Sequence, residues 1–416
     1  MRFAALTLSA FCLFAFGCSA GPGPDETVEG EDELRGGAAS TKAVVKGNTE
    51  FATDLYQELK DGDDNVFFSP YSISSALAMT YAGANGGTAT AMREALRLPS
   101  GNVHAAFKSI AAQLKSRNAT DYRGRAGFQL SVANSLWGEK TQRFDSGFVS
   151  VVGDNYGAGL ELADFLHKAD AERVRINTWV SDQTNAKIKD LLPPNILKAD
   201  TKLVLVNAIY FKAEWDSPFR TDNTEREPFA PLAGGSVNVD MMSQTRSMNH
   251  AATEAYDAVA LPYAGNEVEL VAIAPKAGTF RNFERTFDAA KLTQITGAME
   301  PKRVALSLPK FKIEGASVKL KDKLESLGMG VAFTDSADFR GITGSRDTKI
   351  ADVVHKAFIA LDEKGTEAAA ATAVINVARG MVPRQPITAR FDRPFLFAIR
   401  DVPTGTVLFM GRVAKP

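Results

Sequence analysis

The apolar residues of this chain follow two different patterns, one typical of helices and one typical of buried strands. Val45, Phe51, Leu55 and Leu59 recur at near-helical spacing, which predicts an amphipathic helix at the start of the folded body. By contrast, residues 203–211 (LVLVNAIYF) form a continuous apolar run, as expected of a strand buried on both faces. The body is therefore expected to combine helices with a well-covered sheet.

A short strand leading into a helix is expected near residue 70. The apolar residues 66–68 precede Ser69, which suits a helix N-cap, and Pro70, which suits the first turn. This helix is expected to end at a group of glycines: Gly83, Gly86 and Gly87. A second helix is expected over residues 90–98.

The rest of the chain continues this mixture. A helix is expected from Ile176 onward, with a stop at Pro193 and Pro194. Further apolar runs are predicted to be strands: 268–274, 304–313, 395–400 and 406–413. Helical patterns fall mostly in the first half and strand patterns in the second, which predicts an α+β fold with large sheets and no internal repeat.

Composition narrows the class of protein. The chain has 416 residues, 45% of them hydrophobic, and a formal net charge of -1. Near-neutral charge without a basic run gives no reason to expect a nucleic-acid partner. The two cysteines, Cys12 and Cys18, both precede the folded body. No disulfide is therefore expected within the body.

The N-terminus has the pattern of an export signal. An apolar run from Phe3 to Phe16 follows Met1-Arg2, and residues 1–17 are predicted to be a signal peptide. The sequence AFGC ending at Cys18 resembles the lipobox of bacterial lipoproteins, although an alanine stands where leucine is usual. We expect export across the inner membrane and lipidation of Cys18, with the protein anchored at the bacterial envelope or extracellular. Ordinary cleavage near Ala20 is the alternative.

Residues 18–42 separate this signal from the body. They are rich in Gly, Pro and acidic residues and carry almost no apolar side chain. Such a segment cannot bury enough surface to fold, so it is expected to be a tether with an end-to-end distance of roughly 25–30 Å. Residues 43–416 are expected to form a single domain.

The body carries no recognisable catalytic motif. It has no G-x-S-x-G elbow, H-E-x-x-H helix, phosphate-binding loop or C-x-x-C pair. Its histidines are too scattered for metal-ligand spacing: His104, His167, His250 and His355. The sequence predicts a protein that is not an enzyme and that uses neither a metal nor another cofactor.

Residues 362–379 (DEKGTEAAAATAVINVAR) have contradictory local preferences. The alanines favour helix, whereas the β-branched residues that follow favour an extended chain. An alanine-rich surface helix is one interpretation. The other is a segment that a sheet could accept as an inserted strand with one face buried. Alternate positions are small or β-branched and uncharged: Thr366, Ala368, Ala370, Thr372, Val374 and Asn376. Glu367 would then lie on the opposite face.

This segment resembles the hinge of the reactive-centre loop of inhibitory serpins, a family of serine protease inhibitors. The resembling residues are Glu363, Gly365, Thr366, Glu367, Ala368, Ala369, Ala370, Ala371 and Thr372. Other blocks resemble serpin signatures in the family's order: NVFFSPYSISSALAMTYAGA, INTWVSDQTNAKIKDLLPP, LVLVNAIYFKAEWDSPF, VVHKAFIALDEKGTEAAAAT and RPFLFAIRDVPTGTVLFMGRV. The resemblance implies three β-sheets, a cluster of about eight to nine helices and an exposed loop over residues 363–390.

The resemblance also implies roles for residues outside the loop. Family members place a histidine, an asparagine and helix serines in a polar cluster beneath the point where the main sheet opens, and the matching residues are Ser69, Ser72, Asn207 and His355. Trp215 matches a tryptophan at the top of the sheet, where insertion starts. Without the resemblance, His355 would be read as an ordinary buried histidine.

The implied activity is suicide-type inhibition. A serine protease cleaves the loop, and the loop inserts into the main sheet while the protease is still held as an acyl-enzyme. Family spacing predicts the cleaved bond at Arg379–Gly380, which suits a trypsin-like protease. Because the stretch after Arg379 is longer than usual, Met381 and Arg384 are alternatives. Met381 would suit an elastase-like protease.

Two other functions stay open on the sequence alone. One is a non-inhibitory serpin that acts as a binding or storage protein, and the other is a surface adhesin. Subtilisin-like or cysteine proteases are further targets to consider. The inhibitor is expected to be a metastable monomer whose partner is a covalently trapped protease.

Overall fold

The computed structural model of this chain describes residues 39–117, 128–157, 159–314, 317–367 and 385–416. The predicted signal peptide, Cys18 and most of the predicted tether lie outside these residues. So do Ala368 to Thr372 and the candidate reactive-bond residues from Arg379 to Arg384.

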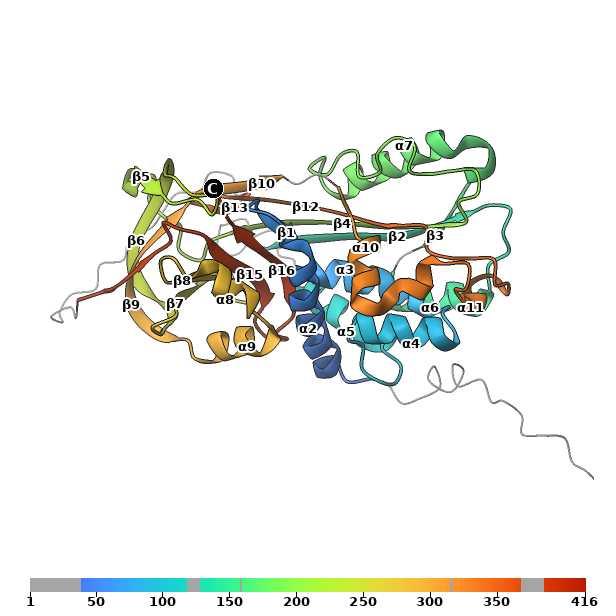
Figure 1. Ribbon diagram of the computed structural model, residues 1–416, viewed down its shortest axis with the longest axis horizontal. Helices are drawn as coiled ribbons and strands as arrows, with labels where there is room; N and C mark the ends of the chain where they lie inside the picture. The colour runs from blue at the N-terminus through green and yellow to red at the C-terminus, as the bar shows by residue number, and fades with distance from the viewer. Residues whose placement is uncertain (1–38, 118–127, 158, 315–316, 368–384) are drawn as a thin grey trace, which may run out of the picture.

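The main sheet has seven strands and runs along the upper part of the molecule (Figure 1). Its strands lie in the order β10 (Phe311–Glu314), β12 (Val353–Leu361), β13 (Gly365–Thr366), β4 (Leu203–Glu214), β2 (Gln129–Glu139) and β3 (Leu160–Ala163), with β11 (Val318–Lys319) also paired to β12. Nearly every residue of β4 is buried, as the continuous apolar run 203–211 predicts.

A second ladder joins nine strands. Its path is β1 (Val66–Phe68), β16 (Val407–Val413), β15 (Phe395–Asp401), β8 (Val268–Pro275), β7 (Tyr256–Pro262), β6 (Val237–Ala252), β9 (Glu300–Pro309) and β14 (Ile387–Arg390), with β5 (Thr224–Phe229) beside β6. The long strand β6 pairs with β9 over Met241–His250 and with β7 over Asn249–Ala252. It therefore connects one group of strands (β5, β9 and β14) to another (β7, β8, β15, β16 and β1), and these two groups together with the main sheet make up the three sheets of the fold.

Ten α-helices occur in the described residues, and two of them have only four residues. They are α2 (Thr41–Leu59), α3 (Pro70–Tyr81), α4 (Gly86–Ala95), α5 (His104–Ser116), α6 (Ser146–Tyr156), α7 (Phe165–Gln183), α8 (Phe280–Arg285), α9 (Ala289–Gly297), α10 (Lys321–Leu324) and α11 (Arg340–Thr343). Helix α7 covers one face of the main sheet, and α2 to α6 gather on the other (Figure 1).

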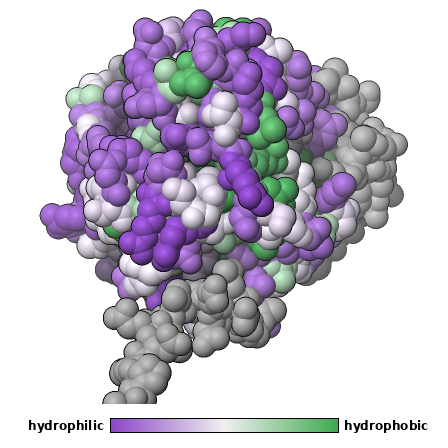
Figure 2. All heavy atoms as spheres, turned by 90° about the vertical axis from the view of Figure 1, so that its right-hand side faces the viewer, coloured by the Kyte–Doolittle hydropathy of each residue, from purple (hydrophilic) through white to green (hydrophobic). Residues whose placement is uncertain are grey.

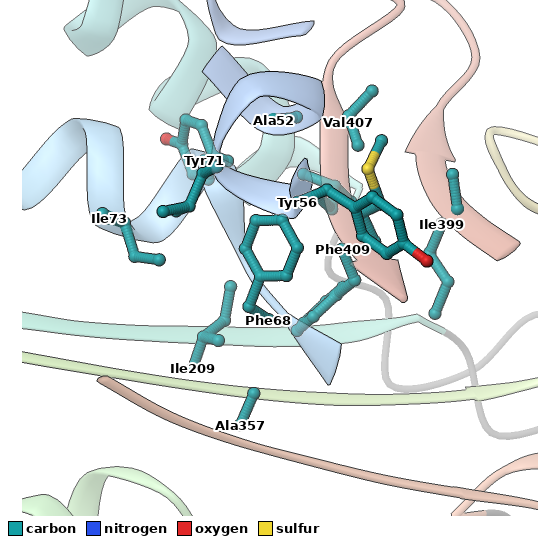
Figure 3. Packing of buried hydrophobic residues seen from close by; sticks show 14 of the residues in the cluster. Ala52, Tyr56, Phe68, Tyr71, Ile73, Ile209, Ala357, Ile399, Val407 and Phe409 are labelled. Atoms are coloured by element: carbon teal, nitrogen blue, oxygen red, sulfur yellow. The ribbon is translucent and has the colours of Figure 1, made fainter. Parts of the chain in front are cut away.

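The main core lies between the main sheet and the helices beneath it. Figure 3 shows Ile209 of β4 and Ala357 of β12 pointing from the sheet toward Phe68 and Phe409, with Tyr56 of α2 close by. All five side chains are buried. Removal of this much apolar surface from water supplies the main stabilisation of the fold.

Several predicted boundaries were wrong at turns. Ser40 caps α2 by accepting a hydrogen bond from the Ala43 N–H at 3.1 Å, so Thr41 and Lys42 belong to the first helical turn rather than to the tether. Gly86 and Gly87 begin α4 instead of ending α3, which stops at Tyr81.

Two further predictions were wrong because tertiary structure interrupts a continuous pattern. Helix α7 begins well before Ile176 and ends at Gln183, because positive φ angles at Asn185 (50°) and Ala186 (59°) turn the chain before the prolines are reached. The run 304–313 divides into β9 and β10, which lie in different sheets. Among the strands of six or more residues, β2, β5, β6 and β7 were not predicted.

The surface over the right-hand end of Figure 1 is largely hydrophilic, with apolar side chains in small patches (Figure 2). Among the described helices, none is both long enough and apolar enough to cross a bilayer.

Candidate functional site

Strands β4 and β12 meet along a seam that is closed at one end and open at the other. At the closed end they pair in parallel, from Val353 opposite Leu205 to Ala357 opposite Ile209. At the open end β13 lies between them, with Thr366 opposite both Leu361 and Ala213. The main sheet therefore already holds the two residues of β13 as the start of an extra strand.

His355 lies at the closed end, opposite Asn207 in the parallel ladder. Its Nε2 accepts the backbone N–H of Ser69 at 3.1 Å, which leaves the ring proton on Nδ1, where it is donated to Asn207 Oδ1 at 2.6 Å. Burial lowers the pKa of His355 to about 3, so the ring is neutral at ordinary pH. The neutral ring joins β12 to β4 and to the start of α3.

Asn207 extends this cluster toward β2. Its amide nitrogen donates to Asn134 Oδ1 at 2.6 Å and to the hydroxyl of Ser72. Ser69 completes it, because its hydroxyl donates to the Leu408 carbonyl at 2.6 Å and caps α3 by accepting the Ser72 N–H at 3.2 Å. The closed end is thus held by neutral hydrogen bonds among buried or half-buried groups.

The open end is built around a tight turn from Asp362 to Gly365. Asp362 Oδ1 accepts the Lys364 N–H at 2.8 Å, and the Asp362 N–H donates to the Gly365 carbonyl at 3.0 Å. Trp215, at the end of β4, holds this turn twice: its indole N–H donates to the Asp362 carbonyl at 3.0 Å and its backbone N–H donates to the Lys364 carbonyl at 2.8 Å. The turn aims the following residues into the seam.

Gly365 is required by close approach as well as by its backbone angle. Its φ is +151°, and a Cβ at this position would lie 2.1 Å from the Ala213 carbonyl oxygen and 2.7 Å from Glu214 Cα. The backbone of β4 cannot yield to relieve such contacts. Only glycine fits where the hinge enters the sheet.

Glu363 is anchored on the outside of this turn. Its carboxylate accepts from Lys310 Nζ at 2.6 Å and from the Thr224 hydroxyl at 2.8 Å. Burial by itself would raise the pKa of Glu363, but the hydrogen bonds from Lys310 and Thr224 outweigh it and hold the pKa below the ordinary value. The carboxylate is therefore ionised at neutral pH and binds the turn to the junction between β9 and β10.

The side chain of Thr366 faces the core. It is fully buried, and its hydroxyl is 2.8 Å from that of Tyr263. Tyr263 in turn stacks on Trp215, with ring centroids 4.5 Å apart. The first inserted side chain is thus in contact with the aromatic pair at the top of the sheet.

Glu367 faces the opposite side, as the alternation predicts. Its carboxylate lies 2.7 Å from Lys187 Nζ, and only 7% of its side chain is exposed. Burial raises the pKa of Tyr210, and a hydrogen bond to Glu367 raises it further. The φ of Glu367 is +56°, so the chain turns out of the strand direction at this residue.

The predicted residues therefore fall into two groups. Ser69, Ser72, Asn207 and His355 lie together at the closed end. Trp215 lies at the open end with the described part of the hinge: Glu363, Gly365, Thr366 and Glu367. The hinge residues Ala368 to Thr372 and the candidate bond residues Arg379, Gly380, Met381 and Arg384 lie outside the described residues.

Sequence reasoning missed Asn134, Tyr263, Lys187 and Lys310. Asn134 carries a signal of its own, since it interrupts the run SVANSLW with a polar side chain just as Asn207 interrupts LVLVNAIYF. The other residues come from turns and strands far away in sequence, where no local pattern marks them. Within the described ranges, no group of three or more His, Cys, Asp or Glu side chains is placed to hold a metal ion.

A main sheet that holds the first residues of a loop between two parallel strands defines a class of protein, and comparison of the sequence identifies it. The sequence model of the serpin family, described as serine protease inhibitors, matches residues 46–416. This chain belongs to the serpin family.

Individual relatives agree over almost the full length. The chain is 40% identical to an uncharacterized serpin-like protein of Thermococcus kodakarensis over 90% of this chain and 86% of that protein. It is 38% identical to leukocyte elastase inhibitor A of Mus musculus over 90% of this chain and 99% of that protein. The solved structure of uncleaved ovalbumin is similar, with a TM-score of 0.79 at 30% identity over 90% of this chain and 100% of that one.

Proposed function

We propose that this serpin is a suicide-type inhibitor of serine proteases and is not itself an enzyme. In this mechanism a protease cleaves the loop, and the loop then inserts into the main sheet before the acyl-enzyme is hydrolysed. The protease is carried along with the loop and remains covalently attached. A relative named as an elastase inhibitor, at 38% identity, supports this assignment.

One observation carries the proposal: Gly365 and Thr366 already lie in register between β12 and β4. Beyond them, Ala368, Ala370 and Thr372 continue the uncharged alternation along the sequence. If the register of Thr366 continues, these residues follow it onto the core-facing side, where a charge would be costly.

Insertion has a driving force of useful size. A dozen new ladder hydrogen bonds at about 0.5–1.5 kcal/mol each give on the order of 10 kcal/mol, and burial of Ala, Thr and Val side chains adds to this. The intact protein is therefore expected to be metastable, because insertion of a further strand into its main sheet would lower the free energy.

The reactive bond is proposed to be Arg379–Gly380, with Met381 and Arg384 as alternatives for the residue before the cleaved bond. Arginine before the bond suits a trypsin-like pocket that carries an aspartate. The test is incubation of the full chain with trypsin, elastase and subtilisin, followed by denaturing electrophoresis and mass spectrometry of the released peptide. We expect a denaturant-resistant complex with trypsin and a new terminus at Gly380.

Arg379→Glu is expected to abolish the trypsin complex, because it places a carboxylate against the aspartate of the pocket. Arg384→Glu serves as the matched control and should leave the complex intact. Loss in the control alone would move the reactive bond to Arg384. Cleavage without any complex, by all three proteases, would favour the non-inhibitory alternative.

The location is proposed from the leader alone. Export followed by lipidation of Cys18 would anchor a monomeric inhibitor to the envelope through the acidic segment 18–40. Metabolic labelling with a fatty-acid analogue tests this, with Cys18→Ser as the control. An unlabelled mature protein that begins near residue 20 would contradict it.

A further inference from the structure

Lys187 is held in a rigid turn beside the open end of the seam. It follows α7 in a segment where the Ala186 N–H donates to the Ser181 carbonyl at 2.8 Å and the Lys187 N–H donates to the Thr184 carbonyl at 3.0 Å. The next residue, Ile188, is fully buried and anchors the turn. The backbone from which the Lys187 side chain extends is therefore held in place by hydrogen bonds and by the buried Ile188.

This side chain contacts both the hinge and the strand that borders the seam. Its Nζ is 2.7 Å from Glu367 Oε1 and 5.6 Å from the ring centroid of Phe358. Phe358 is the first residue of β12 beyond the part paired with β4. Lys187 thus lies where any further residue of the loop would have to enter.

Glu367 is held in a conformation that ends the strand. Its φ of +56° is in the left-handed region, which residues other than glycine seldom adopt. Its N–H still donates to the Ala360 carbonyl at 3.0 Å, so the backbone is bound to β12 while the chain direction changes. For the following residue to join the sheet in register, Glu367 has to become extended.

We propose that Lys187 is a positioning residue that makes Thr366 the last inserted residue of the hinge in the intact protein. It does so by holding the Glu367 carboxylate on the outer face, which keeps Glu367 in its turned conformation. Release of this contact then accompanies entry of the remaining loop. The expected effect of Lys187 on protease inhibition depends on the proposed function. Its effect on the position of the hinge in the intact protein does not.

Hydrogen–deuterium exchange of the intact, full-length protein tests the resting position. Lys187→Met keeps the apolar stem over Phe358 and removes the charge, and Glu367→Gln removes the other partner. Each is expected to speed exchange of the peptide 360–367 about tenfold, the effect of losing one charged hydrogen bond. The double variant should exchange no faster than the Glu367→Gln variant, because the ion pair with Lys187 is already lost in that variant.

Lys189→Met is the matched control, since it is an exposed lysine of the same turn. Equal exchange in wild type and Lys187→Met would overturn the proposal, as would additive effects in the double variant. Faster exchange in Lys189→Met would overturn it too, because general loosening of the turn would then be sufficient.

Inhibition provides a second readout. At saturating protease, Lys187→Met should form the covalent complex faster by a similar factor, because Glu367 no longer has to break its ion pair. An unchanged or slower rate would overturn the link to insertion. Absence of a complex even in wild type would contradict the proposed function, and the exchange result would still decide the resting position.

Discussion

The closed end of the seam between β4 and β12 is held by neutral groups, whereas the open end adds ion pairs to the neutral contacts of Trp215 and Thr366. At the closed end His355, Asn207 and Ser69 are buried and form a chain of neutral hydrogen bonds. At the open end, the carboxylates of Glu363 and Glu367 pair with lysines whose side chains are 33% and 44% exposed. Hydrogen bonds between neutral groups thus join the two strands at one end, and ion pairs contribute at the other.

This difference indicates which end can move. Separating buried neutral partners leaves donors and acceptors unsatisfied, at about 1–3 kcal/mol for each group. Water reaches the lysines of the open end and can replace part of what they lose when they separate from their partners. The open end is therefore suited to change its contacts repeatedly, and the closed end to open only when a strand arrives to fill it.

Thr366→Arg should break the open end most severely. It places a cation in a fully buried position beside Tyr263, and an unpaired buried charge costs several kcal/mol. We expect formation of the covalent protease complex to fall more than about 100-fold, while loop cleavage continues. Stoichiometry of inhibition measures this. Thr366→Ser is the control, and a stable complex in Thr366→Arg would refute the insertion mechanism.

The closed end should respond to pH through His355. Its folded pKa of about 3 is below the ordinary value, so the unfolded chain binds one more proton between about pH 3 and 6.5. Stability from this residue is complete above pH 6.5 and is lost as the pH falls, by about 2 kcal/mol at pH 5.

His355→Gln should flatten that part of the pH dependence, since glutamine does not titrate. Chemical denaturation of the two proteins between pH 5 and 8 measures the difference. His104, whose pKa burial lowers to about 4, is unchanged in both and cancels. Parallel curves for wild type and variant would show that His355 is not the titrating group.

Gly365→Ala should have the smallest effect, because the hinge can relieve the clash by leaving the sheet. We expect a loss of about 1 kcal/mol or more, together with faster amide exchange at Trp215, whose N–H is bound to the Lys364 carbonyl. Gly87→Ala is the matched control: it lies in α4 with open space around its Cβ position and should be neutral or stabilising. Equal behaviour of the two variants would argue against the close approach at Gly365.

Much of this arrangement could be predicted because its signals are local. The apolar run around Asn207, the cap at Ser69 and the alternation that starts at Thr366 each depend on neighbouring residues in the sequence. The contacts of Lys187, Lys310 and Tyr263 could not be predicted, because the residues that meet at the hinge come from three separate parts of the chain. Helix α7 ended early for the same reason, since its end is set by a turn of positive φ residues rather than by the prolines.

The direction of the strands also marks this seam as the weakest place in the main sheet. Within the main sheet, every neighbouring pair from β10 to β2 runs antiparallel except β12 with β4, and this sheet's other parallel pair, β2 with β3, lies at its edge. Parallel ladders are slightly weaker per residue. A strand inserted between β12 and β4 would run antiparallel to both of them, as β13 already does. The parallel pairing of β12 with β4 would then be replaced by two antiparallel pairs.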